Sequence, residues 1–250
     1  MKETAETPWY ERDSFWKTFE PLLFTSKVIA AASQDVEHAI AMMKVEPGAR
    51  ICDLCCGIGR HSLELARRGF QVTSVDRTVR YLDQAKAKAE AEGLNIEFVH
   101  QDVRDFRRPD SFDAVINLYT SFGYFEKPRE NIAVLENIYA SLKSGGKLLM
   151  ELMSKEVLAR IFQERDWRQE DAILLEERKV GKNWEYIEAR WILFKDGKKY
   201  EHTFSHKLYS AVELCEILSR CSFRLMETFG GLDGSPYDQN ANRLTVLGCK

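Results

Sequence analysis

The sequence lacks any long apolar run, and this absence excludes the commonest kind of membrane protein. None of its hydrophobic segments approaches the roughly 18 residues that a membrane-spanning helix needs. The first eight residues are polar, so we expect no secretory signal. Cysteine is scarce, with six in 250 residues. Without a signal, these thiols are expected to stay reduced in a cytoplasmic protein.

An excess of charge of one sign is also missing. Lys and Arg number 36 and Asp and Glu number 39, which gives a net charge of −3 and a pI near 6.0. A protein that binds nucleic-acid backbones needs a basic excess, so we expect no nucleic-acid partner. Hydrophobic residues make up 44% and charged residues 30% of the chain, which excludes a disordered or collagen-like protein.

Strand-like apolar runs alternate with helix-like segments between residues 48 and 152. Such an alternation is typical of βαβ units, which build a parallel sheet with helices on both faces. Ligands of these sheets bind beyond the carboxyl ends of the strands. We expect strands at 50–55, 70–75, 96–99, 112–117 and 147–150, and helices at 60–68, 78–92 and 130–142, the last of them ended by Ser144-Gly145-Gly146.

The sequence pattern changes after residue 154. A helix is expected at 155–164, and three β-rich stretches follow at 173–180, 184–194 and 199–209. Asp196-Gly197 lies between the last two and predicts a hairpin turn. These stretches indicate an antiparallel insert. A helix at 211–221 and strands at 223–229 and 243–248 are expected to complete the first sheet.

The first 45 residues are expected to be helical and are rich in aromatic side chains. Such a stripe is more often core packing than a functional surface. The alternative is a lid over a ligand site, in which case Trp9, Tyr10 and Trp16 would contact the substrate.

Gly57-Ile58-Gly59 forms a tight turn between a strand and a helix. Glycine there lets the backbone approach a ligand, and the helix start presents N–H groups. A plain tight turn would have the same glycines. The dinucleotide fingerprint requires a third glycine where this chain has Ser62. A carboxylate at Asp76 can accept two hydrogen bonds from ribose hydroxyls, and Asp102 can accept one from an adenine amino group.

The segment Asp53-Leu54-Cys55-Cys56-Gly57-Ile58-Gly59 resembles the first motif of class I S-adenosylmethionine (SAM)-dependent methyltransferases. The similarity continues through Val75-Asp76, Gln101-Asp102-Val103 and the segments 112–117 and 142–146, and it covers residues 48–152. Within this family the chain looks like the stand-alone bacterial small-molecule methyltransferases that carry an aromatic N-terminal helix and a C-terminal β insert. One departure is Arg60, which replaces the usual third small residue of the loop.

The resemblance implies SAM as cofactor and S-adenosylhomocysteine as product. It also implies an α/β fold: a Rossmann-like, seven-stranded, mostly parallel sheet with helices on both faces. The N-terminal helical lid would span 1–46, the SAM-binding domain 47–153 and 210–250, and the helix and antiparallel β insert 154–209.

The resemblance further assigns roles to residues. Gly57 and Gly59 would shape the loop beneath the methionine moiety and ribose, and Asp53 would support that loop. Asp76 would bind the ribose, and Asp102 with Val103 the adenine. Arg77 is expected to face solvent. The full expected cofactor set is Asp53, Cys55, Cys56, Gly57, Gly59, Arg60, His61, Asp76, Arg77, Gln101, Asp102, Val103, Asn117 and Leu118.

The segment 117–125 follows the fourth strand, where an acceptor would dock. Tyr119 and Tyr124 are candidates to orient or deprotonate the acceptor, and Phe122 to wall it, although these residues would also fit core and rim positions. Arg243 would suit an anionic acceptor, or it belongs to an ordinary surface loop. The loop lacks the prolines typical of enzymes that methylate bases or glutamine. We expect no metal site, because the pair Cys52 and Cys55 lacks a second pair at zinc spacing.

These patterns favour a SAM-dependent methyltransferase that moves a methyl group to a small-molecule acceptor by in-line displacement, as a monomer or homodimer. One alternative is a SAM-binding scaffold without catalysis, which the sequence separates poorly from an enzyme. Another is an NAD-dependent oxidoreductase, against which Ser62 and Asp102 weigh.

Overall fold

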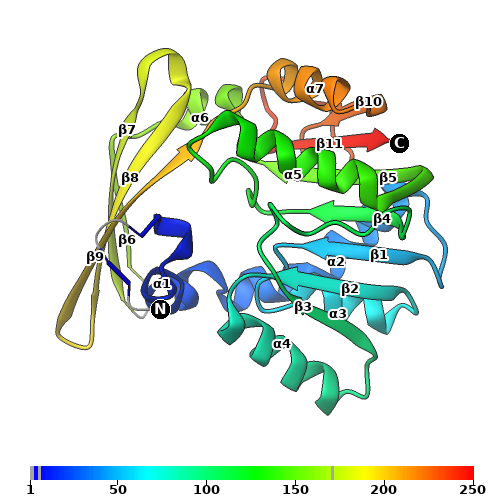
Figure 1. Ribbon diagram of the computed structural model, residues 1–250. Coiled ribbons are helices and arrows are strands. Elements are labelled where there is room, and N and C mark those ends of the chain that lie inside the picture. Colours follow the sequence, from blue (N-terminus) through cyan, green and yellow to red (C-terminus); the bar gives the residue numbers. More distant parts are fainter. Residues whose placement is uncertain (1–2, 5–6, 170–171) are drawn as a thin grey trace.

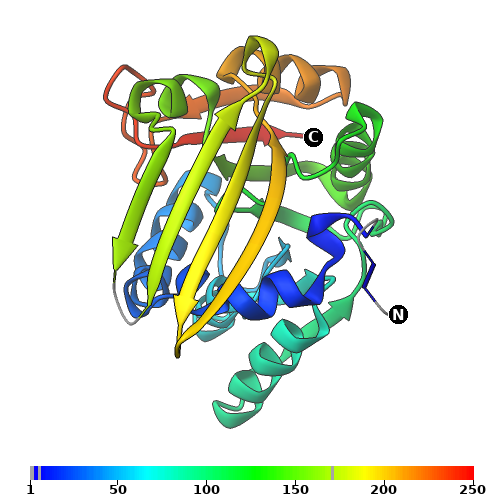
Figure 2. The same ribbon diagram turned by 90° about the vertical axis from the view of Figure 1, so that its left-hand side faces the viewer.

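The computed structural model describes residues 3–4, 7–169 and 172–250 (Figure 1). Residues 1–2 and 5–6 of the expected lid, and 170–171 of the expected insert, lie outside the described residues. The described chain forms two sheets, and an N-terminal helix lies between them (Figures 1 and 2). We call them the large sheet and the small sheet.

The large sheet has seven strands in the order β10-β11-β5-β4-β1-β2-β3. Its five N-terminal strands run parallel to one another, and β11 is antiparallel to both of its neighbours. This arrangement confirms the expected fold class. The strands are β1 (Arg50–Leu54), β2 (Gln71–Asp76), β3 (Ile96–His100), β4 (Phe112–Asn117), β5 (Leu142–Leu152), β10 (Arg224–Phe229) and β11 (Leu244–Cys249).

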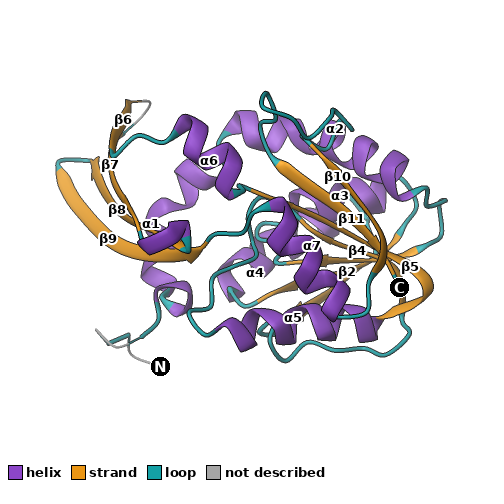
Figure 3. Ribbon diagram, turned by 90° about the horizontal axis from the view of Figure 1, so that it is seen from above, coloured by secondary structure: helices purple, strands orange, loops and turns teal. Residues whose placement is uncertain are grey.

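The central strands β1 and β4 are each buried at all but one residue, because helices cover both faces of the large sheet. On one face, Val36, Met43 and Leu65 pack against the sheet. On the other face, Leu135 and Leu214 do so. The covering helices lie on opposite sides of the sheet in Figure 3. They are α2 (Ser26–Met43) and α3 (Arg60–Arg67) on the first face, and α5 (Pro128–Ser141) and α7 (Ala211–Arg220) on the second; α4 (Val79–Ala91) joins β2 to β3.

Expected boundaries are wrong at two places: the helix expected at 155–164 ends at Ile161, and the helix expected to end at Ser144-Gly145-Gly146 ends before them. The glycines Gly145 and Gly146 do not end a helix; α5 ends at Ser141 and β5 begins at the next residue. Leu142 already pairs with Phe112 of β4, so the chain joins the sheet before it reaches the glycines. The turn at Gly145 and Gly146, with a φ of +76° at Gly145, lies inside the bounds of β5, where the pairing with β4 is irregular.

The small sheet is antiparallel throughout, in the order β6-β7-β8-β9. Asp196 and Gly197 form its expected hairpin turn, both with positive φ. The edge strand β6 was not expected, because its five residues are exposed and carry no alternation of apolar side chains. The elements are α6 (Lys155–Ile161), β6 (Arg165–Gln169), β7 (Ile173–Val180), η2 (Lys182–Trp184), β8 (Tyr186–Lys195) and β9 (Lys198–Lys207).

The N-terminal segment (residues 7–24) holds η1 (Trp9–Glu11) and α1 (Asp13–Leu23). Phe15 and Phe19 on α1 are buried against Leu174 and Leu193 of the small sheet. Part of the aromatic stripe is therefore core, as its spacing favoured. Among the described residues, no helix is both long enough and apolar enough to cross a membrane.

Candidate functional site

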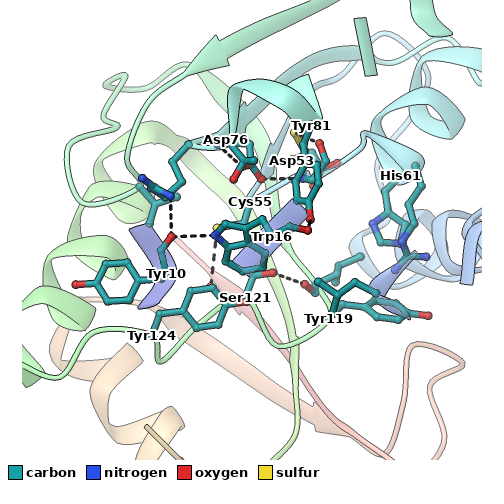
Figure 4. A pocket seen from close by; sticks show the side chains of 18 of the residues that line it. Tyr10, Trp16, Asp53, Cys55, His61, Asp76, Tyr81, Tyr119, Ser121 and Tyr124 are labelled. Carbon is teal, nitrogen blue, oxygen red and sulfur yellow. Dashed lines mark hydrogen bonds between the residues drawn. The ribbon is translucent and has the colours of Figure 1, made fainter. Parts of the chain in front are cut away.

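One cavity of about 180 Å³ opens at the carboxyl ends of β1, β2, β3 and β4 (Figure 4). Residues from each of these strand ends line it, together with residues from the N-terminal segment. It lies where ligands of open α/β sheets bind. Its lining is Tyr10, Trp16, Leu23, Phe24, Val28, Asp53, Cys55, Cys56, Gly57, Arg60, His61, Asp76, Arg77, Thr78, Tyr81, Asp102, Val103, Leu118, Tyr119, Ser121, Tyr124 and Phe125.

The floor of the cavity is the glycine turn between β1 and α3. Gly57 has a φ of +55° and Gly59 a φ of +73°. Both values lie in the left-handed region that favours glycine. A β-carbon on Gly59 would lie 2.7 Å from the β-carbon of Ala85 on α4. The turn therefore needs glycine for its backbone conformation and for its close approach to α4.

Two buried carboxylates brace this turn from below. Asp53 accepts a hydrogen bond from Ser62 Oγ at 2.5 Å. Asp76 accepts hydrogen bonds from the N–H groups of Gly57 and Thr78, each at 2.8 Å. Burial raises the pKa of both carboxyl groups. Asp76 thus links the end of β2 to the glycine turn and still borders the cavity.

Asp102 lines the cavity from the end of β3, and Arg104 binds its carboxylate at 2.7 Å. Burial alone would raise the pKa of Asp102, but the hydrogen bonds and charge of Arg104 outweigh it, and the pKa is lowered. Arg104 also contacts Glu11 at 2.8 Å and Glu130 at 3.3 Å. One guanidinium therefore joins the end of β3 to the N-terminal segment and to α5.

The N-terminal segment forms the roof of the cavity through Tyr10, Trp16 and Phe24. The Tyr10 carbonyl accepts hydrogen bonds from Arg77 at 2.7 Å and from the Trp16 indole at 3.0 Å (Figure 4). Tyr81 of α4 donates to the Trp16 carbonyl at 2.8 Å. Arg77, expected to face solvent, therefore turns to the roof instead.

The loop after β4 forms the wall opposite β2. Tyr119 has a φ of +58° and Thr120 a φ of +60°, which are strained values for non-glycine residues. Glu151 holds this conformation by accepting the Tyr119 N–H at 2.9 Å. The Arg60 guanidinium lies 3.8 Å from the centre of the Tyr119 ring. Arg60, the residue that departs from the family pattern, thus covers this wall.

The phenols of Tyr119 and Tyr124 keep their protons more tightly than an exposed tyrosine. Burial raises the pKa of Tyr119, with Arg60 opposing the shift, and burial also raises the pKa of Tyr124. Each phenol is therefore suited to donate a hydrogen bond near neutral pH, not to accept a proton.

Six residues of the expected sites lie outside the lining. Gln101 donates its side-chain N–H to Asp105 O, and Asn117 donates its own to Leu54 O, each at 3.0 Å. Gly59 belongs to the turn but faces Ala85 of α4. Of the expected substrate residues, Trp9 packs behind Tyr124, Phe122 packs on Tyr209, and Arg243 pairs with Glu151 at 3.2 Å. Tyr10 and Trp16 do line the cavity, as do the other eleven expected cofactor residues and both tyrosines.

Sequence reasoning missed Tyr81, Thr78 and Ser121 as lining residues. Thr78 and Tyr81 directly follow Asp76 at the start of α4, so their position beside an expected ribose ligand was a usable signal. Phe24 belonged to the aromatic stripe, but nothing in the sequence placed its ring on Gly57.

Residues 51–146 match the family described as "Methyltransferase domain". Two of the solved structures that share the fold illustrate the match. A SAM-dependent methyltransferase from Clostridium acetobutylicum ATCC 824 aligns with a TM-score of 0.79 and 16% identity, over 95% of this chain and 98% of that one. The sequence match covers residues 51–146 and is to a methyltransferase domain family, and the structural match is one of fold. A sugar N-methyltransferase from Streptoalloteichus sp ATCC 53650 aligns with a TM-score of 0.68 and 18% identity, over 100% and 97% of the two chains.

Two of the curated relatives illustrate the similarity in sequence. A protein of Geobacillus sp. (strain WCH70), named a methyltransferase with no acceptor given, is 36% identical over 160 residues, or 62% of each chain. The 23S rRNA (uracil(1939)-C(5))-methyltransferase of Cronobacter sakazakii is 32% identical over 118 residues, or 45% of this chain and 27% of that enzyme. The chain therefore spans less than two thirds of either relative. The resemblance drawn from the motifs is nevertheless confirmed at the level of the domain.

Proposed function

We propose that this chain is a SAM-dependent methyltransferase that transfers a methyl group to a small-molecule acceptor by in-line displacement. The observation that carries the proposal is the meeting of Asp53, Asp76 and Asp102 from three strand ends around one cavity, above a glycine turn. Each carboxylate borders the cavity at a strand end that the family uses for its cofactor. SAM, when bound, supplies an activated methyl group.

The residues of the cavity fit SAM chemically. Asp76 presents a carboxylate for the ribose hydroxyls, and Asp102 and Val103 border the space for the adenine. Aromatic faces such as those of Trp16 and Tyr124 suit a sulfonium cation. These carboxylates and aromatic rings therefore suit a cofactor that carries a positive charge on its sulfur.

The volume of the cavity must increase for SAM to bind. A cavity of about 180 Å³ is smaller than the roughly 300–1,000 Å³ of most ligand pockets. The ring of Phe24 lies on Gly57, where the cofactor would cross the turn. We therefore propose that the N-terminal segment acts as a lid that shifts outward when SAM enters.

The acceptor is proposed to dock beside the loop after β4. Tyr119 and Tyr124 would orient it by donating hydrogen bonds, because their raised pKa values keep both phenols protonated. Phe122 would back this wall, while Trp9 and Arg243 would act from behind Tyr124 and Tyr119. A small acceptor is favoured because the N-terminal segment roofs the cavity. The sugar N-methyltransferase with this fold offers a precedent, whereas the rRNA enzyme has most of its length outside the shared domain.

Calorimetric titration with SAM, S-adenosylhomocysteine and NAD tests the cofactor, after mass spectrometry has checked the protein for a co-purified ligand. We expect binding of the first two and none of NAD. Binding of NAD alone would overturn the proposal. A screen of amine, hydroxyl and carboxylate acceptors then tests catalysis, because a scaffold would bind SAM and release no S-adenosylhomocysteine with any acceptor.

A further inference from the structure

The small sheet has one face that no helix of the described chain covers, and Figure 2 shows this face toward the viewer. Strand pairing places Trp167, Leu175 and Ile192 in one row across it, because Trp167 pairs with Leu175 and Leu175 with Ile192. Trp167 is 63% exposed. Leu175 beside it is 36% exposed, so the two side chains give the margin of the sheet an apolar surface.

The margin itself is an open strand edge. Within the described part of the chain, β6 pairs with β7 alone and is the terminal strand of the small sheet. Arg178 N–H donates to Glu164 O at 2.8 Å, so the residues at alternate positions from Glu164 bond to β7. The backbone groups of Arg165, Trp167 and Gln169 therefore point away from β7. The Trp167 N–H is satisfied by its own neighbour, Asp166 Oδ1, at 2.8 Å, and not by another strand.

The sequence of β6 is complementary to itself in the antiparallel sense. It reads Arg-Asp-Trp-Arg-Gln from Arg165 to Gln169. If two copies pair about a two-fold axis at Trp167, Asp166 of each lies opposite Arg168 of the other. The same register brings the two Trp167 side chains side by side, and sets Arg165 opposite Gln169. Opposite charges and aromatic pairs across strands each stabilise an antiparallel pair.

The backbone direction agrees with this register. Trp167 is one of the residues whose N–H and C=O point outward, so the two copies would exchange both bonds at the central residue. Asp166, released from the Trp167 N–H, would then bind Arg168 of the second copy, while its other oxygen lies 3.9 Å from Arg178 of its own chain. Both residues lie on the same face of the sheet as Glu176, which already pairs with Arg168 at 3.1 Å.

We propose that a second copy of this chain docks at β6 and that the two small sheets join into one eight-stranded antiparallel sheet. The contact is isologous, since the same strand serves both copies, and it closes after two subunits. The contact involves one edge strand of the small sheet, β6. The opposite edge strand is β9, which contacts η1 of the roof. The dimer therefore leaves the cavity accessible, and the proposal does not depend on methyl transfer.

Sedimentation velocity and light scattering of the full chain over a range of concentrations test the dimer. We expect a species of twice 28.9 kDa. Asp166→Arg places Arg opposite Arg168 in both symmetric contacts, and Arg168→Asp places Asp opposite Asp166. Each single variant should weaken the dimer by about tenfold or more, as two like-charge pairs replace two opposite pairs.

Mixing the two variants separates a lost contact from a damaged fold. An Asp166→Arg chain and an Arg168→Asp chain are repulsive to themselves but complementary to each other, so their mixture should form heterodimers. The double variant D166R/R168D should form a homodimer again. Lys198→Glu on the opposite edge strand β9 is the matched control and should dimerise like the unaltered chain.

Three outcomes would overturn the proposal. A chain that stays at 28.9 kDa at every concentration would mean that the charges of β6 guard the edge of a monomer. A dimer that persists equally in both single variants would lie on another surface. Variants that stay apart on mixing, although their melting curves match that of the unaltered chain, would exclude the proposed register.

Discussion

The ring of Phe24 lies against the backbone of Gly57, in the turn between β1 and α3. A β-carbon on Gly57 would lie 2.9 Å from Phe24 Cζ, and the residue has a φ of +55°. The roof of the cavity and its glycine floor are thus in direct contact. This contact couples the N-terminal segment to the turn where we place the cofactor.

Gly57→Ala should lower the free energy of unfolding for two separable reasons. The left-handed backbone costs an L-residue about 1–2 kcal/mol, and the new methyl group meets the Phe24 ring. In a Phe24→Ala background only the first cost remains. Urea denaturation of the four proteins in this cycle measures the coupling between the two residues. Strictly additive effects would show that the ring does not press on the turn.

Asp76→Ala should weaken SAM binding by about 2–3 kcal/mol, as expected for loss of a charge-assisted pair of hydrogen bonds. Calorimetry measures the change. Asp83→Ala on the exposed face of α4 removes the same charge near the site and should leave the affinity unaltered. The substitution also removes the acceptor of the Gly57 N–H, so circular dichroism must show that the variant is still folded. Unchanged affinity for SAM would remove the ribose assignment.

Arg104→Ala should loosen the N-terminal segment, because Arg104 joins Glu11 to Asp102 and Glu130. We expect faster amide hydrogen exchange over residues 7–24 and a loss of about 1–3 kcal/mol in stability, in the range of hydrogen bonds to charged groups. Arg107→Ala, an exposed neighbour, is the control. Equal exchange in both variants would mean that other contacts secure the segment.

His206 should make the fold sensitive to mild acid. Burial lowers its pKa from 6.5 to about 4, so below pH 6.5 the unfolded chain takes up a proton that the folded chain does not. The stabilisation from the neutral imidazole is therefore complete above pH 6.5 and is lost as pH falls toward 4, by about 3 kcal/mol in all.

Denaturation of the unaltered chain and of His206→Gln at pH 7.5 and pH 4.5 isolates this contribution, since the carboxyl groups titrate in both proteins. The unaltered chain should lose more stability. An NMR titration of the imidazole gives the pKa directly, and a value near 6.5 would contradict the prediction.

The large sheet was predictable because its parallel strands are buried on both faces, which forces short apolar runs such as that of β4. The strand β6 was not, because all five of its residues are exposed and its pairing with β7 is what makes it a strand. The bounds of β5 were missed for a similar reason. Pairing of Leu142 with Phe112 overrode the usual meaning of a glycine pair after a helix.

The cofactor side of the cavity could be inferred from local sequence. Asp53, Gly57 and Asp76 each follow or end a strand, and parallel strands bring their carboxyl ends to one edge. The roof could not be inferred in the same way. Phe24 at the end of α1 and Tyr81 on α4 reach the cavity because of how these helices pack, and Arg104 reaches Glu11 across 93 positions of the chain.

The amino-acid sequence by itself determined the class of fold, the methyltransferase domain and the carboxylates at its strand ends, because these depend on patterns within a strand, turn and helix. The tertiary structure decided what covers the domain. Only the folded chain sets Phe24 on Gly57, lays Arg60 on the Tyr119 ring at 3.8 Å and, among the described residues, leaves the outer edge of β6 unpaired. Such contacts join residues far apart in the chain, and their geometry follows from how whole elements pack and not from any local pattern.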